Sequence, residues 1–196
     1  MVPAMDDGLT RALKLIAIAL AIAFVGWAAY DRFFVDVAPG DMAYLAGNRA
    51  FDDRAYAQAE AAYREALDEN PGHLFALRGL AQSLHTQGAH EAALATYDEA
   101  IAHDPEFGAT YANRGILLDT MGRHEEALAD YMRALDLEPE LADGPHWLTR
   151  FLRNQPEAPP TIADRADYLR AELAKPAAER VLRVPEIDAR QRPYQQ

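Results

Sequence analysis

The 196-residue sequence contains no cysteine, and this absence excludes several kinds of chemistry. Without a thiol the chain has no disulfide framework, no thiolate metal site and no cysteine nucleophile. Positive charge is also scarce, because 19 lysine and arginine residues stand against 31 aspartate and glutamate residues, which gives a net charge of -12. A nucleic-acid-binding surface needs clustered basic side chains, so we expect no nucleic-acid partner.

The sequence also lacks the patterns of common catalytic and cofactor sites. It has no glycine-rich phosphate loop and no Gly-x-Ser-x-Gly motif. His90-Glu91 and His124-Glu125 resemble the start of a zinc-binding helix, but both lack the second histidine of that motif. The two pairs are 34 residues apart and so occupy the same place in a repeat. We therefore expect no enzyme activity, no cofactor and no metal site.

One long apolar run lies near the start of the chain. Residues 15–30 carry no charge, Lys14 precedes them, and aromatic residues continue to position 34. As a helix the uncharged run spans about 24 Å, and the flanking lysine stem and aromatic rings extend it toward the ~30 Å of a bilayer core. The sequence predicts a leader over 1–14 and a transmembrane, signal-anchor helix over 15–35.

Two other interpretations of this run stay open. A signal peptide cleaved after Ala28 needs small residues at the site, and Trp27 lies inside it. A buried helix of a soluble domain needs protein on every side, which a chain of this size hardly supplies. Basic groups before the run slightly outnumber those after it, which favours a cytoplasmic start. We expect a single-pass protein of the bacterial inner membrane with its soluble domain in the periplasm.

A period of 34 residues dominates the middle of the chain. It relates one proline column, one tyrosine column and two alanine columns. These columns are Pro71, Pro105 and Pro139; Tyr63, Tyr97 and Tyr131; Ala59, Ala93 and Ala127; and Ala66, Ala100 and Ala134. The pattern resembles the tetratricopeptide repeat (TPR) family, whose 34-residue unit has small residues at positions 8, 20 and 27, an aromatic residue at 24 and proline at 32.

The resemblance implies an all-α fold, a helix-turn-helix solenoid of three TPR units over 40–73, 74–107 and 108–141. Small residues let the two helices of each unit approach closely, and the tyrosine fills the groove between them. Because solenoid ends need covering, we expect a capping helix over 142–153 that carries Trp147 and Phe151.

The remaining residues follow this solenoid. A proline-rich linker over 154–160 precedes an amphipathic helix over 161–175, which begins with Thr161 and Asp164 in capping-box spacing. This helix either packs on the convex side of the solenoid or docks to a partner. The last stretch, 176–196, contains prolines and four arginines and is expected to be an extended tail.

In the TPR family, which this sequence resembles, the concave surface is lined by the first helix of each unit and binds partner segments. Carried over to this sequence, the partner-binding groove consists of Tyr44, Asn48, Phe51, Phe75, Arg78, Gln82, His85, Ala112, Ile116 and Asp119. The chaperone-binding members clamp an acidic tail with lysine, arginine and asparagine, but residues 40–141 contain no lysine. The same residues hold 19 acidic side chains and seven arginines, so the whole charge imbalance lies in the repeats.

Acidic and aromatic lining favours a protein or peptide ligand with an apolar or basic segment. The sequence thus predicts a membrane-anchored, non-enzymatic TPR adaptor that acts in assembly or stabilisation of a membrane or envelope complex. The alternative is a permanent structural subunit of a larger membrane enzyme complex. The tail itself is another candidate ligand of the groove, either in its own chain or in a neighbouring copy, and the sequence leaves the oligomeric state open.

Overall fold

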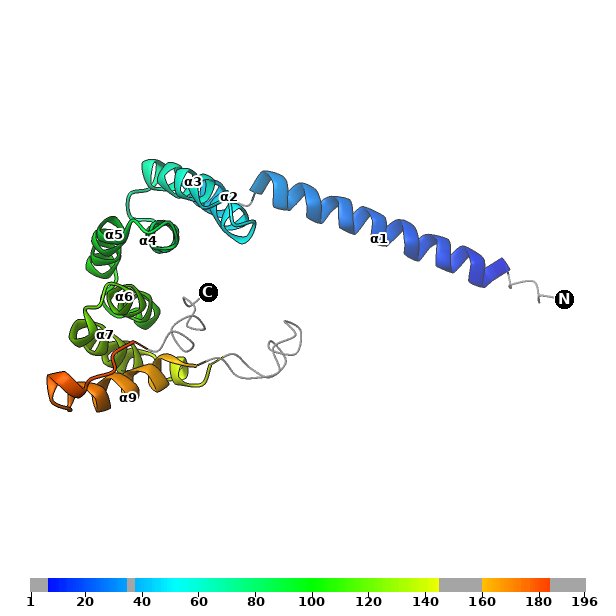
Figure 1. Cartoon of the computed structure of the whole chain (residues 1–196). Coiled ribbons are helices and arrows are strands. Elements are labelled where there is room, and N and C mark those ends of the chain that lie inside the picture. Colours follow the sequence, from blue (N-terminus) through cyan, green and yellow to red (C-terminus); the bar gives the residue numbers. More distant parts are fainter. Residues whose placement is uncertain (1–6, 35–37, 145–159, 184–196) are drawn as a thin grey trace. The chain divides into compact units, whose positions relative to one another are not determined.

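The computed structural model describes residues 7–34, 38–144 and 160–183. Within these ranges all regular structure is helical. The chain forms two compact units, Met1–Ala38 and Pro39–Gln196 (Figure 1). The expected capping helix over 142–153 lies mostly outside the described residues, as do most of the linker and residues 184–196 of the tail.

The first unit contains one long helix, α1 (Asp7–Phe34). Its 28 residues correspond to about 42 Å at the usual helical rise. The window Thr10–Trp27 has a mean hydropathy of 1.7, and none of it is buried. Leu15, Ile22 and Phe24 are each about two thirds exposed. By length and composition, α1 is therefore able to cross a bilayer core.

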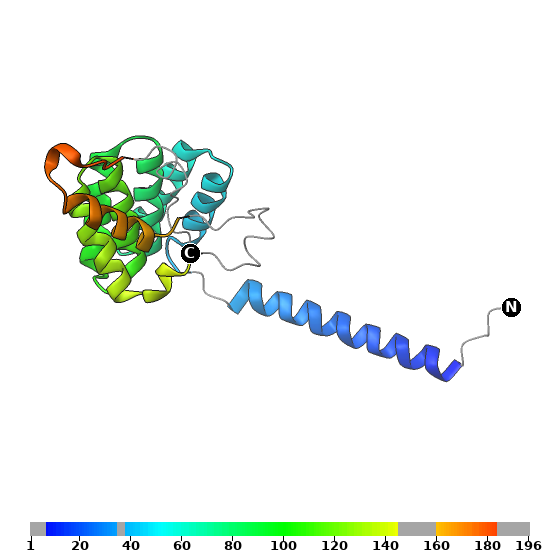
Figure 2. The ribbon, with the colours of Figure 1, turned by 60° about the horizontal axis from the view of Figure 1, so that its bottom comes forward.

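The second unit is a series of three packed helix pairs followed by a C-terminal helix. The pairs are α2 (Asp41–Asp52) with α3 (Tyr56–Glu69), α4 (Leu74–Thr86) with α5 (His90–His103), and α6 (Gly108–Thr120) with α7 (His124–Leu137). The first helix of each later pair packs against the second helix of the pair before it, α4 on α3 and α6 on α5. Figures 1 and 2 show the resulting stack of helical hairpins.

Each hairpin turns at a residue with positive φ, fifteen residues into its unit. Gly88 (φ 81°) and Gly122 (φ 79°) occupy this place in the second and third pairs, and Arg54 (φ 60°) occupies it in the first. The next backbone N–H then donates to a carbonyl in the last turn of the preceding helix, as in Ala89 N to Leu84 O at 2.9 Å. This closure ends the first helix and reverses the chain.

The repeated tyrosines and alanines form the core. Tyr63, Tyr97 and Tyr131 are at most 2% exposed, and all the alanines of the two periodic columns are fully buried. A Cβ placed on Gly47 or Gly79 would lie 2.5–2.6 Å from the ring of Tyr63, so this ring fits between glycines of two successive units. The close approach of the helices therefore depends on the absence of side chains at these glycines.

The C-terminal part of the solenoid consists of η1 (Pro139–Ala142), α9 (Ile162–Leu173) and η2 (Ala177–Glu179). Thr161 caps α9, because its hydroxyl accepts from the backbone N–H of Asp164 while the Asp164 carboxylate accepts from the Thr161 N–H. Ile162, Ala166 and Leu169 are buried against residues of α6 and α7. The apolar stripe of α9 is thus covered by its own chain, at the place where the first helix of a next repeat would pack.

Candidate functional site

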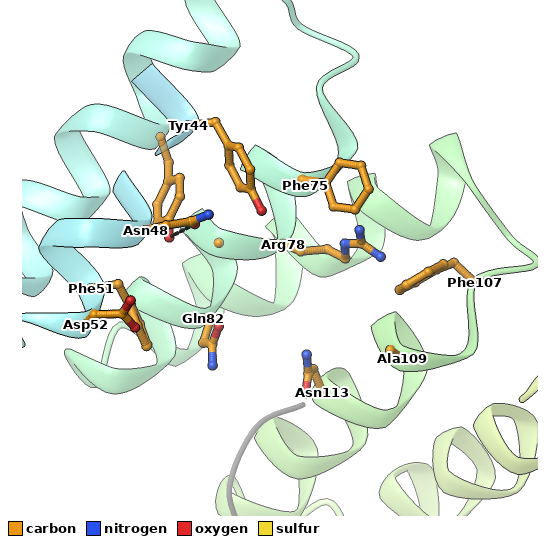
Figure 3. A pocket seen from close by; sticks show the side chains of 12 residues that line it. Tyr44, Asn48, Phe51, Asp52, Phe75, Arg78, Gln82, Phe107, Ala109 and Asn113 are labelled. Atoms are coloured by element: carbon orange, nitrogen blue, oxygen red, sulfur yellow. Dashed lines mark hydrogen bonds between the residues drawn. The ribbon is translucent and has the colours of Figure 1, made fainter. Parts of the chain in front are cut away.

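A cavity of about 210 Å³ opens between α2, α4 and α6. Its lining residues come from these three helices, from α3 and from the turn before α6 (Figure 3). The lining consists of Tyr44, Asn48, Phe51, Asp52, Tyr63, Phe75, Arg78, Gly79, Gln82, Phe107, Ala109 and Asn113. On α2 and α4 the lining positions recur three and four residues apart, because such residues share one face of a helix.

Aromatic rings form one end of the cavity. The ring of Tyr44 lies 6.0 Å from that of Phe75 and 5.0 Å from that of His73, centroid to centroid. His73 is held in place because its Nδ1 accepts from the backbone N–H of Ala76 and its Nε2 bonds Asp41 at 3.1 Å. Phe75 is 48% exposed, so its ring offers apolar surface to a ligand.

Arg78 places a buried cation beside these rings. Its guanidinium carbon lies 3.8 Å from the ring centroid of Phe107 and 4.6 Å from that of Phe75. Burial lowers the pKa of Arg78 from its usual value, although an arginine still carries its charge at neutral pH. The cation-π contacts stabilise this charge within the protein. A second cation at this end of the cavity would therefore be repelled.

Amide side chains from three successive units face the cavity. The Asn48 carbonyl accepts from the Tyr63 hydroxyl at 2.8 Å, which leaves its NH2 group on the cavity side (Figure 3). Gln82 on α4 and Asn113 on α6 also line the space. Amide groups both donate and accept, so they match the peptide groups of an extended chain. The exposed carboxylate of Asp52 lies beside Phe51, away from Arg78 (Figure 3).

The cavity contains only part of the expected groove. Six of the expected residues line it, namely Tyr44, Asn48, Phe51, Phe75, Arg78 and Gln82. His85 instead lies 5.7 Å from the ring of His90, and burial lowers the pKa of His85 to about 4. Ala112 and Ile116 belong to the core cluster that includes residues of α7 and α9.

Asp119 is the remaining expected residue, and it is used inside the protein. Its carboxylate accepts from Arg165 Nε of α9 at 2.6 Å and pairs with His124 Nδ1 at 2.8 Å. Both Asp119 and Arg165 have side chains that are at most 5% exposed. The ion pair links α9 to the end of α6, so this part of the expected groove is covered.

Several lining residues were not among those expected. Phe107 is the last residue of the second unit, and the family pattern assigns the concave surface only to positions within the first helix of each unit. Gly79 and Asn113 hold the sixth position of the second and third units and also line the cavity. The partly buried ring of Phe107 joins the site through its contact with Arg78. Gly79 lies four residues after Phe75, so helical spacing alone could have placed it on the same face of the helix.

Comparison with known protein families agrees with the paired helices and their periodic small residues. A family model described as "Tetratricopeptide repeat" matches residues 108–141, and a second with the same description matches residues 50–114. Residues 50–141 belong to the tetratricopeptide repeat family. The TPR fold is typically a non-catalytic module for protein interaction, and the described residues contain no group of three or more metal-ligating side chains.

Solved TPR structures share this fold. The first TPR of Spaghetti (RPAP3), bound to the HSP90 peptide SRMEEVD, matches with 24% sequence identity and a TM-score of 0.52, over 63% of this chain and 94% of that chain. The Arabidopsis OM64 TPR domain matches with 25% identity and a TM-score of 0.50, over 52% of this chain and 84% of that chain. No curated protein matches the chain.

Proposed function

We propose that this chain is a membrane-anchored TPR adaptor whose cavity between α2, α4 and α6 binds an extended segment of a protein partner. The observation that carries the proposal is the lining itself, in which aromatic rings and amide groups from three successive units face one space. Rings take up apolar side chains, and amides bond the peptide main chain. The adaptor acts in assembly or stabilisation of a membrane or envelope complex.

The ligand segment is apolar with basic residues. The net charge of residues 40–141 is -12, so the field of the repeats attracts a basic chain. The buried guanidinium of Arg78 restricts basic residues to the Asp52 end of the cavity. The fold neighbour from Spaghetti binds an acidic peptide. Because the repeats of this chain have no lysine, we propose the same mode of binding with a ligand of different charge.

The anchor is α1, whose apolar window has no buried residue. Only six residues, 35–40, separate the end of α1 from the start of α2. Six residues reach at most about 20 Å, so insertion of α1 would keep the solenoid close to the lipid. With Arg11 and Lys14 before the apolar window, we propose that the start of the chain is cytoplasmic and the repeats are periplasmic in a bacterial inner membrane.

In-cell photo-crosslinking tests the adaptor function. A photoreactive amino acid at Phe75 of the full chain should yield a discrete crosslinked protein, because the side chain lies in the cavity. The same amino acid at the exposed Glu65 on α3, outside the cavity, is the matched control and should yield none. Equal crosslinking at both positions, or none at Phe75 and Tyr44, would contradict the proposal. An isolated chain that aggregates in detergent would favour a permanent subunit over an adaptor.

A further inference from the structure

We infer that residues 184–196 bind in cis to the cavity between α2, α4 and α6, as a built-in competitor of the partner. This inference rests on the proposed function, because it concerns the same cavity. It names the occupant as a segment of this chain, with the sequence VPEIDARQRPYQQ. Three observations carry it: the place where the segment starts, its length and its chemistry.

The chain is held firmly up to the residue before this segment. After α9 it runs back along that helix, where Val181 N donates to Glu172 Oε2 at 2.8 Å. Arg165 Nη2 donates to Leu182 O at 3.0 Å. Arg183 Nη2 then donates to the carbonyl of Thr120, the last residue of α6, at 2.6 Å. The segment therefore starts at the end of a helix that lines the cavity.

The segment is long enough to reach the cavity. Asn113 lines the cavity from α6 and lies seven residues before Thr120, which corresponds to about 10 Å along the helix axis. Thirteen extended residues span up to about 43 Å. Pro185 and Pro193 restrict the backbone toward extended conformations, and an extended ligand is the form that the amide groups of the cavity match.

The chemistry of the segment complements the lining. Val184, Ile187 and Tyr194 supply side chains for the aromatic end of the cavity. The segment is neutral overall, because Glu186 and Asp188 balance Arg190 and Arg192. Its two arginines have no acidic residue between or after them, so the acidic repeats and the exposed Asp52 attract this last part of the segment.

Covalent connection makes the competition effective. A tethered segment of this length experiences an effective concentration in the millimolar range, so even weak intrinsic binding keeps the cavity occupied. A partner must then displace the segment, which favours partners that are themselves concentrated near the protein.

A peptide-binding assay tests the inference on the full chain in detergent micelles. The probe is a fluorescein-labelled peptide with the sequence of residues 184–196, and its binding is followed by fluorescence anisotropy. A variant that ends at Arg183 should bind the probe at least about tenfold more tightly than the full chain, because the competitor is missing. Equal affinity for the two proteins, or no binding to either, would overturn the inference. The inference would also be overturned if the weaker probe binding of the full chain disappeared when the protein is diluted, since this indicates that the segment binds to a second copy.

A charge reversal makes the test specific for the cavity. In the variant ending at Arg183, Asp52→Arg should weaken binding of the probe about fivefold to tenfold, and a probe with aspartate in place of Arg190 and Arg192 should recover the loss on that variant. The matched control is Glu65→Arg, which makes the same charge change on the exposed face of α3. An equal effect of both substitutions would overturn the assignment to this cavity. If Phe75 still crosslinks a partner in cells while the probe does not bind, only this inference fails and the adaptor function stands.

Discussion

Tyr63 is packed so tightly between two helices that a single methyl group decides its fit. A Cβ at Gly79 would lie 2.5 Å from Cζ of this ring, which is closer than carbon atoms approach without displacement. The sequence pattern marks the tyrosine as a core residue, and the structure adds that a glycine of the following unit receives its ring.

We expect Gly79→Ala to destabilise the solenoid by about 1–3 kcal/mol, the usual cost of overpacking a core. Gly72→Ala is the matched control, because a Cβ there meets no atom closer than 3.7 Å. Thermal unfolding of the full chain in detergent, followed by circular dichroism, measures both. Similar midpoints for the two variants would contradict the packing argument.

Asp119 and Arg165 form an ion pair that is buried in the protein. Removing the arginine leaves the carboxylate buried, with His124 and the Tyr131 hydroxyl as its remaining side-chain partners among the described residues. We expect Arg165→Ala to cost about 3–5 kcal/mol, as for other broken buried ion pairs. Arg170→Ala on the exposed side of the same helix should change stability by less than about 0.5 kcal/mol. Alanine forms helices at least as well as arginine, so a loss of equal size for both variants would contradict the assignment of the effect to the buried ion pair.

His85 makes stability depend on pH. Burial and the neighbouring His90 lower the pKa of His85 to about 4, below the 6.5 of an unfolded chain. Between pH 6.5 and 4 the unfolded state therefore takes up a proton that the folded state does not, and stability falls as the pH falls. The loss is at most about 3 kcal/mol over this range.

Comparison of unfolding midpoints at pH 7.5 and 4.5 checks this prediction. His85→Gln should lose less stability on acidification than the unchanged chain does. His103→Gln, at an exposed histidine, should lose as much as the unchanged chain. The prediction is wrong if the two variants respond alike.

At the scale of elements, α9 closes the end of the solenoid. Its stripe covers apolar side chains of α6 and α7, while Arg165 and Arg183 bond the end of α6. In repeat proteins each unit contacts only its neighbours, so loss of such a cover acts locally.

We expect a variant that ends at residue 160 to show faster amide hydrogen exchange in α6 and α7 and little change in α2 and α3. The variant that ends at Arg183 keeps all the described contacts of α9 and is the control. Hydrogen exchange of the full chain and both variants, read by mass spectrometry, makes the comparison. A change spread evenly over all helices would contradict the local role of α9.

The elements also show which features the sequence could predict. The period of 34 residues predicts the solenoid, because each column reports a contact within or between adjacent hairpins, and the fold is confirmed. The contact between Asp119 and Arg165 joins residues 46 apart outside that period. For this reason the third unit appears open in the sequence, whereas in the structure α9 covers Ile116 and Asp119.

The same reasoning applies to the cavity. Helical spacing on the first helix of a unit predicts that residues such as Tyr44, Phe75 and Arg78 share a face. The stacking of Phe107 on Arg78 depends on the angle between successive hairpins, which local spacing does not specify. The role of these residues in binding stays a prediction until a partner is captured.

At the scale of the whole molecule, the proposed insertion of α1 into a membrane would set where the repeats act. We expect the full chain expressed in bacteria to stay with the membrane after alkaline extraction. Arginines in place of Ile18 and Ile22 should release it, because each costs about 2.5–3.5 kcal/mol at the centre of an inserted helix. Leucines at the same positions are the control. A mature chain that starts at Ala29 would show cleavage and contradict the anchor.

The asymmetry of the two solenoid ends has a consequence for association between copies. Stacking of one solenoid on the next, head to tail, would need the last unit to receive the first unit of another molecule. The place for that contact is already taken by α9, which packs on α7. Open filaments require such a repeating, non-closing contact. The first unit, on which Met42 and Leu45 of α2 are exposed, therefore finds no open last unit to pack on in a second copy.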